Sequence, residues 1–185
     1  MTTTTLQTLT GDYDLDASHS RLGFAAKHAM VTTVRGQFGS FTADIHLDAE
    51  NVANTTARLE INAASIDTGN PDRDAHVRNS DFLEVETYPT ISFISTGAEQ
   101  NSDDDFVLHG DLTIKDVTKP VSIEFEKTGE AVDPWGNFRI GFEGKAKINR
   151  KDWGVNFNAV LEAGGLLVSD KVTLEFDIAA VRRSA

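Results

Sequence analysis

The residues that most often carry out chemistry in proteins are few in this chain and far apart. The five histidines, His19, His28, His46, His76 and His109, form no His-x-His or His-x-x-x-His pair, and such pairs commonly place two imidazoles on one metal ion. The chain has no cysteine, which excludes disulfides and thiolate chemistry. It also lacks a Gly-x-Ser-x-Gly segment for a nucleophilic serine and a glycine-rich phosphate loop before a helix. These features predict a protein that is not an enzyme and uses neither a metal nor a resident cofactor.

His28 is the histidine whose position is most informative. It shares one side of an alternating segment with Phe24 and Ala26, so its ring is expected to point inward or to lie at the mouth of a barrel. A lone inward histidine is more often a hydrogen-bonded core residue than a ligand contact, and both interpretations stay open. His46 and His109 fall on the polar side of their segments and are expected at the surface.

The elements that must position these residues are mostly strands. Apolar and polar residues alternate with a period of two, which is the pattern of half-buried strands. A turn signal, Asp133-Pro134-Trp135-Gly136-Asn137, separates two of the runs. Many short strands, each with one apolar side, indicate an all-β sandwich or barrel. The alternating runs cover residues 22–28, 41–47, 57–63, 91–97, 106–114, 117–125, 138–148 and 172–178.

One stretch between residues 69 and 89 interrupts the strands. Asn70-Pro71, with acids at residues 72 and 74, suits the start of a helix, because proline favours the first helical position and acids favour the first turn. Tyr88-Pro89 then requires an extended exit. The sequence therefore predicts one short helical crossover. Arg73, Asp74 and His76 are expected to attach this crossover to the rest of the domain by structural pairing.

The alternation breaks again after residue 148. Asn149, Arg150 and Asp152 are expected to form a polar network that fixes a turn. Trp153 follows directly, and we predict that this aromatic residue lines a pocket.

Charge and length narrow the range of partners. The 185 residues include 29 acids against 17 Lys and Arg, a net charge of −12, which argues against nucleic acid and against docking through a polybasic patch. Residues 12–185 are expected to form a single domain after a Thr-rich, poorly ordered tail at residues 1–11. No signal-peptide pattern and no apolar run of about 20 residues occurs. We therefore expect a cytoplasmic protein without an integral membrane segment.

Several motifs are spread over the chain, and the similarity that they carry spans roughly residues 12–181. They are Arg73-Asp74-x-His76-x-Arg78-x-Ser80-Asp81-Phe82, Tyr88-Pro89-x-Ile91-x-Phe93, Val34-Arg35-Gly36-Gln37-Phe38, Gly110-Asp111-Leu112-Thr113-Ile114, Val117-Thr118-Lys119-Pro120-Val121 and Asn149-Arg150-Lys151-Asp152-Trp153-Gly154. Together these motifs resemble the YceI-like family of lipocalin-like barrels, which are associated with binding polyisoprenoid lipids. The resemblance implies an antiparallel β-barrel of about eight strands with one helical crossover, and non-enzymatic binding, transport or storage of a long-chain apolar lipid. Many members of that family are exported with leader peptides, and this chain departs from them there.

The apolar sides of the strands bear on whether the interior is hollow. Small residues interrupt the Phe, Ile, Leu and Val positions at Ala43, Ala57, Ala63, Gly110, Gly144 and Ala146. This pattern suits a ligand-sized space, and it equally suits side chains that alternate in size to fill a taper. The family resemblance favours the space. In particular, Ala43 and Ala146 are both expected to face it.

Such a lining would select a long hydrocarbon, such as a polyisoprenoid or an isoprenoid quinone, with any polar head at the mouth. An unpaired polar group inside would cost several kcal/mol, and specificity among isoprenoid and acyl chains should be loose. The predicted ligand-binding residues are Phe24, His28, Phe38, Phe41, Ala43, Ile45, Leu59, Phe82, Ile91, Phe93, Phe106, Leu112, Ile123, Phe125, Phe142, Ala146, Trp153, Phe157 and Phe176.

Two other functions remain open at this level. The first is a filled barrel that serves as an interaction module, such as a homodimer formed through Ile94 or Val107 on the outer face. The second is an enzyme that acts on a bound isoprenoid. That enzyme would need an inward polar pair, for which His28 is the one candidate.

Overall fold

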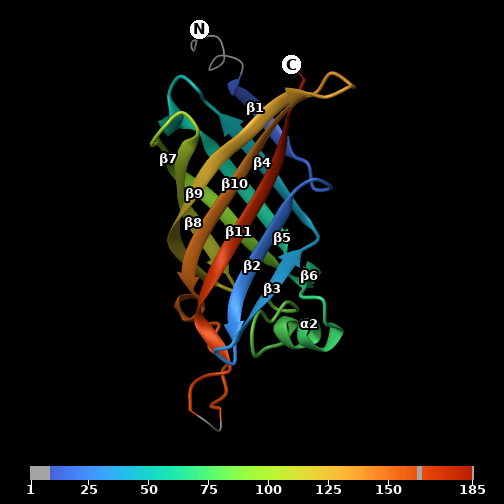
Figure 1. Ribbon diagram of the computed structural model, residues 1–185, viewed down its shortest axis with the longest axis vertical. Coiled ribbons are helices and arrows are strands. Elements are labelled where there is room, and N and C mark those ends of the chain that lie inside the picture. The colour runs from blue at the N-terminus through green and yellow to red at the C-terminus, as the bar shows by residue number, and fades with distance from the viewer. Residues whose placement is uncertain (1–8, 162–163, 185) are drawn as a thin grey trace.

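The computed structural model describes residues 9–161 and 164–184, which form an antiparallel β-barrel with one short α-helix (Figure 1). The strands are β1 (Gly11–Leu15), β2 (Arg21–His28), β3 (Thr32–Phe38), β4 (Phe41–Leu47), β5 (Thr56–Asn62), β6 (Ile66–Asp67), β7 (Thr90–Gln100), β8 (Asp105–Ile114), β9 (Val117–Val132), β10 (Phe138–Asn149) and β11 (Val168–Arg182). The α-helix is α2 (Pro71–Arg78), and three single-turn helices are η1 (Val52–Asn54), η2 (Ala63–Ser65) and η3 (Arg150–Trp153).

The barrel closes through a ring of eight strands in its described part. The order is β1-β4-β5-β7-β8-β9-β10-β11, and β1 pairs with β11 to complete the ring. Tyr13 lies opposite Arg182 in that closing pair, so strands near the two ends of the chain meet. The predicted barrel of about eight antiparallel strands is confirmed.

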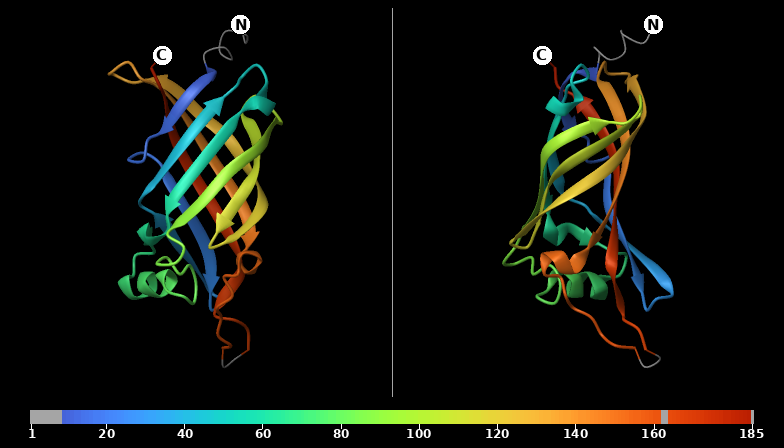
Figure 2. Two further views of the ribbon diagram at one scale, coloured as in Figure 1. Left: turned by 180° about the vertical axis from the view of Figure 1, so that it is seen from behind. Right: turned by 90° about the vertical axis from the view of Figure 1, so that its left-hand side faces the viewer.

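The lower half of the barrel, at the bottom of Figure 1, is built differently. There β11 pairs with β2 instead of β1, and β3 and β6 follow β2 in the sheet. No described strand pairs with the free side of β6, so the sheet is open between β6 and β7. The helix α2 and the segment after it lie in the chain between these two strands. Figure 2 shows that they lie at one side of the lower end of the barrel.

The helical crossover forms as predicted. Pro71 is its first residue, and the Asn70 side chain accepts hydrogen bonds from the backbone N–H groups of Asp72 and Arg73. This cap satisfies two donors that a helix start leaves unpaired. After Pro89 the chain enters β7 at Thr90, as the proline requires.

Several strands differ from the predicted runs. β1, β3 and β6 lie outside them, and β9 and β11 extend beyond them. β7 continues to Gln100 through a register shift between Ser95 and Gly97, because the extra residue of a bulge lets the strand bend without ending. At the N-terminus, the predicted tail lies outside the described residues up to residue 8. Leu9 is buried, and it accepts a hydrogen bond from the Tyr13 hydroxyl at 2.8 Å. Ordered structure therefore begins earlier than the Thr-rich composition suggested.

Glycines allow phenylalanine rings to lie flat on the inner wall. A Cβ atom on Gly36 would overlap the ring of Phe24, and a Cβ on Gly144 would overlap the ring of Phe125. Gly110 stands in the same relation to Phe93. These glycines accommodate neighbouring side chains. Of the two explanations for the small residues on the inward sides, they fit the alternation of large and small side chains and not a ligand-sized space.

No described helix is long and apolar enough to cross a membrane.

Candidate functional site

The interior of the barrel contains two cavities stacked along its axis. The lower cavity has a volume of about 540 Å³ and the upper cavity about 430 Å³, and each falls within the range of about 300–1,000 Å³ typical of ligand sites. The two share a belt of residues, which we call the waist. The waist consists of Leu22, Leu59, Phe93, Ile123 and Phe176. The described barrel is therefore not filled by its own side chains.

All but three of the predicted ligand-binding residues line these cavities. Seven contribute to the lower cavity alone: Phe24, His28, Phe38, Phe82, Ile91, Leu112 and Phe157. Five contribute to the upper cavity alone: Ala43, Ile45, Phe106, Phe125 and Phe142. The remaining four, Leu59, Phe93, Ile123 and Phe176, belong to the waist.

Phe41, Ala146 and Trp153 are the three that line neither cavity, and the expectation that Ala146 and Trp153 face an open space is wrong. Ala146 is 7% exposed and packs within the hydrophobic core, as does Phe41. The indole Nε1–H of Trp153 donates to the carbonyl of Leu112 at 2.9 Å. Alternation identifies the inward side of a strand, but it does not distinguish positions that meet another side chain from positions that meet a void.

Some lining residues were missed. Val155, Leu167 and Val168 come from η3 onward to the start of β11, and Val77 comes from α2. Segments outside the strands have no period-two signal, so only their apolar character could have indicated them. Leu22, in contrast, shares the inward side with Phe24 and was identifiable by the same argument.

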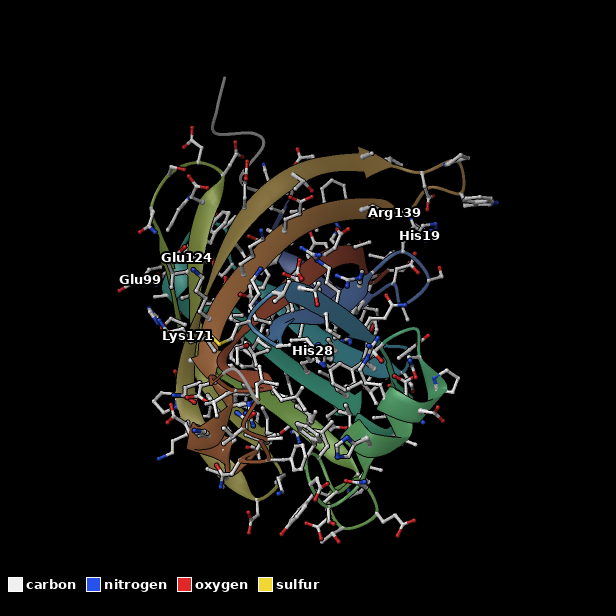
Figure 3. The ribbon with its side chains drawn as sticks, turned by 60° about the horizontal axis from the view of Figure 1, so that its bottom comes forward. His19, His28, Glu99, Glu124, Arg139 and Lys171 are labelled. Atoms are coloured by element: carbon white, nitrogen blue, oxygen red, sulfur yellow. The ribbon has the colours of Figure 1, made fainter. Side chains whose placement is uncertain are left out.

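His28 lies at the lower mouth. It is exposed at the end of β2 and lines the lower cavity, and in the view from below it lies over the lower end of the barrel (Figure 3). Its side chain makes no hydrogen bond to a described residue. The interpretation of His28 as a hydrogen-bonded core histidine is therefore wrong. Its ring nitrogens are accessible from the mouth.

Three rings pack against one another at steep angles, edge to face, beside the same mouth. The His76 ring lies 5.0 Å from Phe82 and 4.9 Å from Phe157, and the two phenyl rings are 5.2 Å apart, centroid to centroid. His76 Nε2 lies 2.9 Å from Asp81 Oδ2, which orients the imidazole. This cluster joins α2 to the segment after η3 and narrows the lower opening.

Arg73 and Asp74 hold α2 against β6 through one residue. Thr68 donates its backbone N–H and its hydroxyl to Asp74 Oδ1 at 2.7 and 2.5 Å. Arg73 in turn donates to the Thr68 hydroxyl at 2.8 Å and to its carbonyl at 2.7 Å. Hydrogen bonds from Thr68 hold the pKa of the buried Asp74 carboxyl below its ordinary value. The predicted structural pairing of Arg73 and Asp74 is confirmed.

Arg150 performs a similar task on the opposite side. It is 5% exposed and donates to the carbonyls of Val155, Val168 and Ser169 at 2.7, 3.3 and 2.9 Å. Burial lowers the pKa of its guanidinium. Asn149 caps η3 by accepting from the N–H of Lys151. Asn149 and Arg150 therefore act in fixing the local chain as predicted, and Arg150 holds the long segment that forms part of the cavity wall. The expectation for Asp152 is wrong, because its side chain is exposed and makes no hydrogen bond to a described residue.

The two ends of the interior differ in charge. The lower cavity is lined by the cationic Lys27, Arg73 and Arg150 against one acid, Asp72, together with His28 and His76. The upper cavity is lined by Asp48, Asp103 and Asp104 against one cation, Lys127. In a chain of net charge −12, the lower mouth is an exception.

The outside of the barrel holds the other predicted features. His46 pairs with Asp12 at 2.8 Å, and His109 contacts Ser122 at 2.7 Å, so both lie on the outer surface as predicted. Of the two residues considered for a dimer contact on the outer face, Ile94 is 48% exposed, whereas Val107 is among the residues that line the upper cavity. No group of His, Asp or Glu within the described ranges is placed to hold a metal ion.

Relatives with curated sequences share most of this chain. A UPF0312 protein of Azotobacter vinelandii is 36% identical over 151 residues, which cover 80% of this chain and 79% of that protein. A UPF0312 protein of Pseudomonas aeruginosa is 36% identical over 154 residues, covering 82% and 80% respectively.

Solved structures share the fold. The Campylobacter jejuni YCEI protein matches with a TM-score of 0.74 and 28% identity over 85% of this chain and 90% of its own. Burkholderia cenocepacia BcnA matches with a TM-score of 0.79 and 23% identity, covering 89% and 98%. A polyisoprenoid binding domain from Saccharophagus degradans matches with a TM-score of 0.69 and 18% identity, covering 92% and 98%.

The sequence profile of the YceI-like domain matches residues 13–180, which include every strand from β2 to β10 and most of the residues that line the two cavities. The chain belongs to the YceI-like family.

Proposed function

We propose that this protein binds a long-chain apolar lipid, of the polyisoprenoid or isoprenoid-quinone type, inside the barrel and carries or stores it without catalysis. The observation that carries the proposal is the pair of cavities that meet at an entirely apolar waist. The structural neighbour from Saccharophagus degradans, a polyisoprenoid binding domain, is consistent with it.

The lining determines the chemistry of the ligand. Between the two mouths almost every lining side chain is aliphatic or aromatic, so a hydroxyl or charge placed there would lose its hydration without gaining a partner, at several kcal/mol. A lipid of about 30 non-hydrogen atoms, at roughly 0.3 kcal/mol per atom, would gain on the order of 9 kcal/mol, which corresponds to sub-micromolar affinity. Hydrophobic burial supplies this energy without fixing the identity of the chain.

The difference in charge between the ends favours one orientation. A head group with acceptor oxygens, such as a phosphate or a quinone, is attracted to the lower mouth, where Lys27, His28 and Arg73 are found. The acids at the upper end repel an anionic head. We therefore place the head at the lower mouth and the tail across the waist.

Organic extraction of the purified protein followed by mass spectrometry tests the proposal. We expect a stoichiometric lipid with a long apolar chain, and we expect the extracted protein to take up an added polyprenol such as solanesol. Failure on both counts, with a correctly folded protein by circular dichroism, would refute it.

A further inference from the structure

Exposed apolar side chains gather at the lower end of the molecule. Met30 is 70% exposed, Val31 78%, Val160 81% and Leu166 39%. We call these four residues the apolar tip. They are a majority of the large hydrophobic residues exposed in the described part of the chain. The others are Ile94 on the barrel wall and Val132 and Trp135 near the opposite end.

The apolar tip joins two segments that are distant in sequence. Met30 and Val31 belong to the turn between β2 and β3, and Val160 and Leu166 belong to the segment between η3 and β11. The backbone N–H of Ala29 donates to the carbonyl of Leu167 at 2.8 Å, and the Met30 sulfur contacts Gly165. Figures 1 and 2 show both segments projecting beyond the lower end of the barrel.

The turn carries Met30 at a conformational cost. Ala29 and Met30 have φ angles of 52° and 62°, and the Val31 N–H donates to the His28 carbonyl at 3.1 Å. Tight hairpin turns with both central residues in the left-handed region strongly favour Asn and Gly. Met30 gains little burial in return, so the stability of the free protein does not explain why a large apolar side chain stands there.

The apolar tip is continuous with the cavity mouth. His28 directly precedes the turn, Leu167 directly follows Leu166, and both line the lower cavity. An apolar lipid that enters this mouth from bulk water would have to expose its whole tail, which the hydrophobic effect opposes. Exposed apolar side chains around the mouth would instead lie in the interface of a bilayer, as amphipathic anchors do.

We infer that the apolar tip docks on the surface of a lipid bilayer and sets the lower mouth against it, so that the ligand passes between membrane and barrel without crossing water. The inference rests on the proposed function. Lys27 and Arg73, which line the same mouth, then face the phosphate groups of the bilayer. The net charge of −12 keeps the rest of the surface away from anionic lipid, which favours this one orientation.

Two substitutions remove apolar contact while preserving the local backbone. Met30→Asn suits the left-handed conformation, and Val160→Thr keeps the β-branched shape. Trp135→Ser is the matched control, because Trp135 is 81% exposed at the opposite end. Wild type should co-sediment with phosphatidylcholine vesicles and with equimolar phosphatidylcholine–phosphatidylglycerol vesicles. The double variant should bind about ten-fold more weakly, the equivalent of about 1.4 kcal/mol, with an unchanged or raised melting temperature, while Trp135→Ser should bind like wild type.

Delivery of solanesol by two routes separates this inference from the proposed function. The double variant should take up solanesol from detergent micelles as wild type does, and should acquire it more slowly from vesicles. No uptake by wild type from micelles, together with no lipid extracted from the purified protein, would overturn the proposed function itself. Uptake from micelles without vesicle binding by wild type would overturn only the docking inference. Equal vesicle binding by wild type and the double variant would also overturn the docking inference. So would a wild-type protein that sediments as a dimer, loses the dimer in the double variant and does not bind vesicles.

Discussion

Ala43 and Ala146 appear equivalent in the sequence, and the structure separates them. Ala43 on β4 lines the upper cavity, whereas Ala146 on β10 is packed in the core. Replacing each of them with phenylalanine adds the same ring to two different surroundings. We expect Ala43→Phe to block ligand uptake in a stable protein, and Ala146→Phe to destabilise the barrel.

The cavity volume and the packing of the core set the magnitudes. At Ala43 the ring enters a space of about 430 Å³, and burying a phenylalanine side chain is worth about 1.5–3 kcal/mol relative to exposing it to water. The ligand-free Ala43→Phe protein should therefore be at least as stable as wild type. Overpacking at Ala146 should cost about 1–3 kcal/mol. For a domain of this size each kcal/mol moves the melting temperature by about 2–4 °C, so Ala146→Phe should melt about 2–12 °C lower.

The assay combines thermal melts of extracted proteins with uptake of solanesol. Ala26→Phe is a second cavity variant, because Ala26 lines the lower cavity, and it should also block uptake without loss of stability. A melting temperature for Ala43→Phe as low as that for Ala146→Phe would refute the claim that the upper cavity is open. Normal uptake by both cavity variants would refute the claim that the ligand occupies the two cavities.

Three further predictions follow from individual contacts. His28→Ala should weaken binding of a quinone or phosphate-bearing lipid but not of a plain hydrocarbon of equal length, with stability within about 0.5 kcal/mol of wild type; equal weakening for both ligands would contradict a head-group contact. The pKa of Asp74 is lowered from its ordinary 3.8, so its contribution to stability is present above that pH and is lost as the pH falls through the lowered folded value; Asp74→Asn should flatten this part of the acid limb in melts against pH, and an unchanged limb would contradict it. Trp153→Phe removes the donor to the Leu112 carbonyl and should cost about 1–3 kcal/mol in denaturant unfolding; a loss of lipid uptake without loss of stability would instead make Trp153 a ligand contact.

Local rules accounted for the helix α2 and for the central part of most strands, but not for β1, β3 and β6. Pro71 and Asn70 identify the start of α2 because capping depends only on neighbouring residues. The alternation that defines β4 from Phe41 to Leu47 likewise reports a property of one strand. Closure of the barrel could not be predicted from local patterns, because β1 pairs with β11 across almost the whole length of the chain. The choice of a barrel over a sandwich came from the family motifs.

The sequence predicted the lining residues that are determined by the direction of a side chain within its own strand. It did not predict those that depend on which side chains of other strands lie opposite. Gly144 lies under the ring of Phe125 and Ala43 lines a cavity, although both are small residues on the inward side of a strand. The difference depends on which side chain stands opposite, which a single strand does not reveal. Arg150 is a comparable case, because its carbonyl partners lie up to nineteen residues away in a segment without periodicity.

The gap between β6 and β7 gives the two ends of the barrel unequal elasticity. In the upper half, hydrogen bonds join every neighbouring strand of the ring, so the circumference there cannot grow without breaking the ladder. In the lower half the free side of β6 has no described strand partner, and α2 is held beside β6 by hydrogen bonds that join Arg73 and Asp74 to Thr68. Side-chain contacts of this kind can lengthen or exchange partners without unfolding the sheet. The circumference of the barrel is therefore held by backbone hydrogen bonds at the upper end, and partly by side-chain contacts at the lower end. This difference suits a ligand that is slender along its chain and bulkier at its head group.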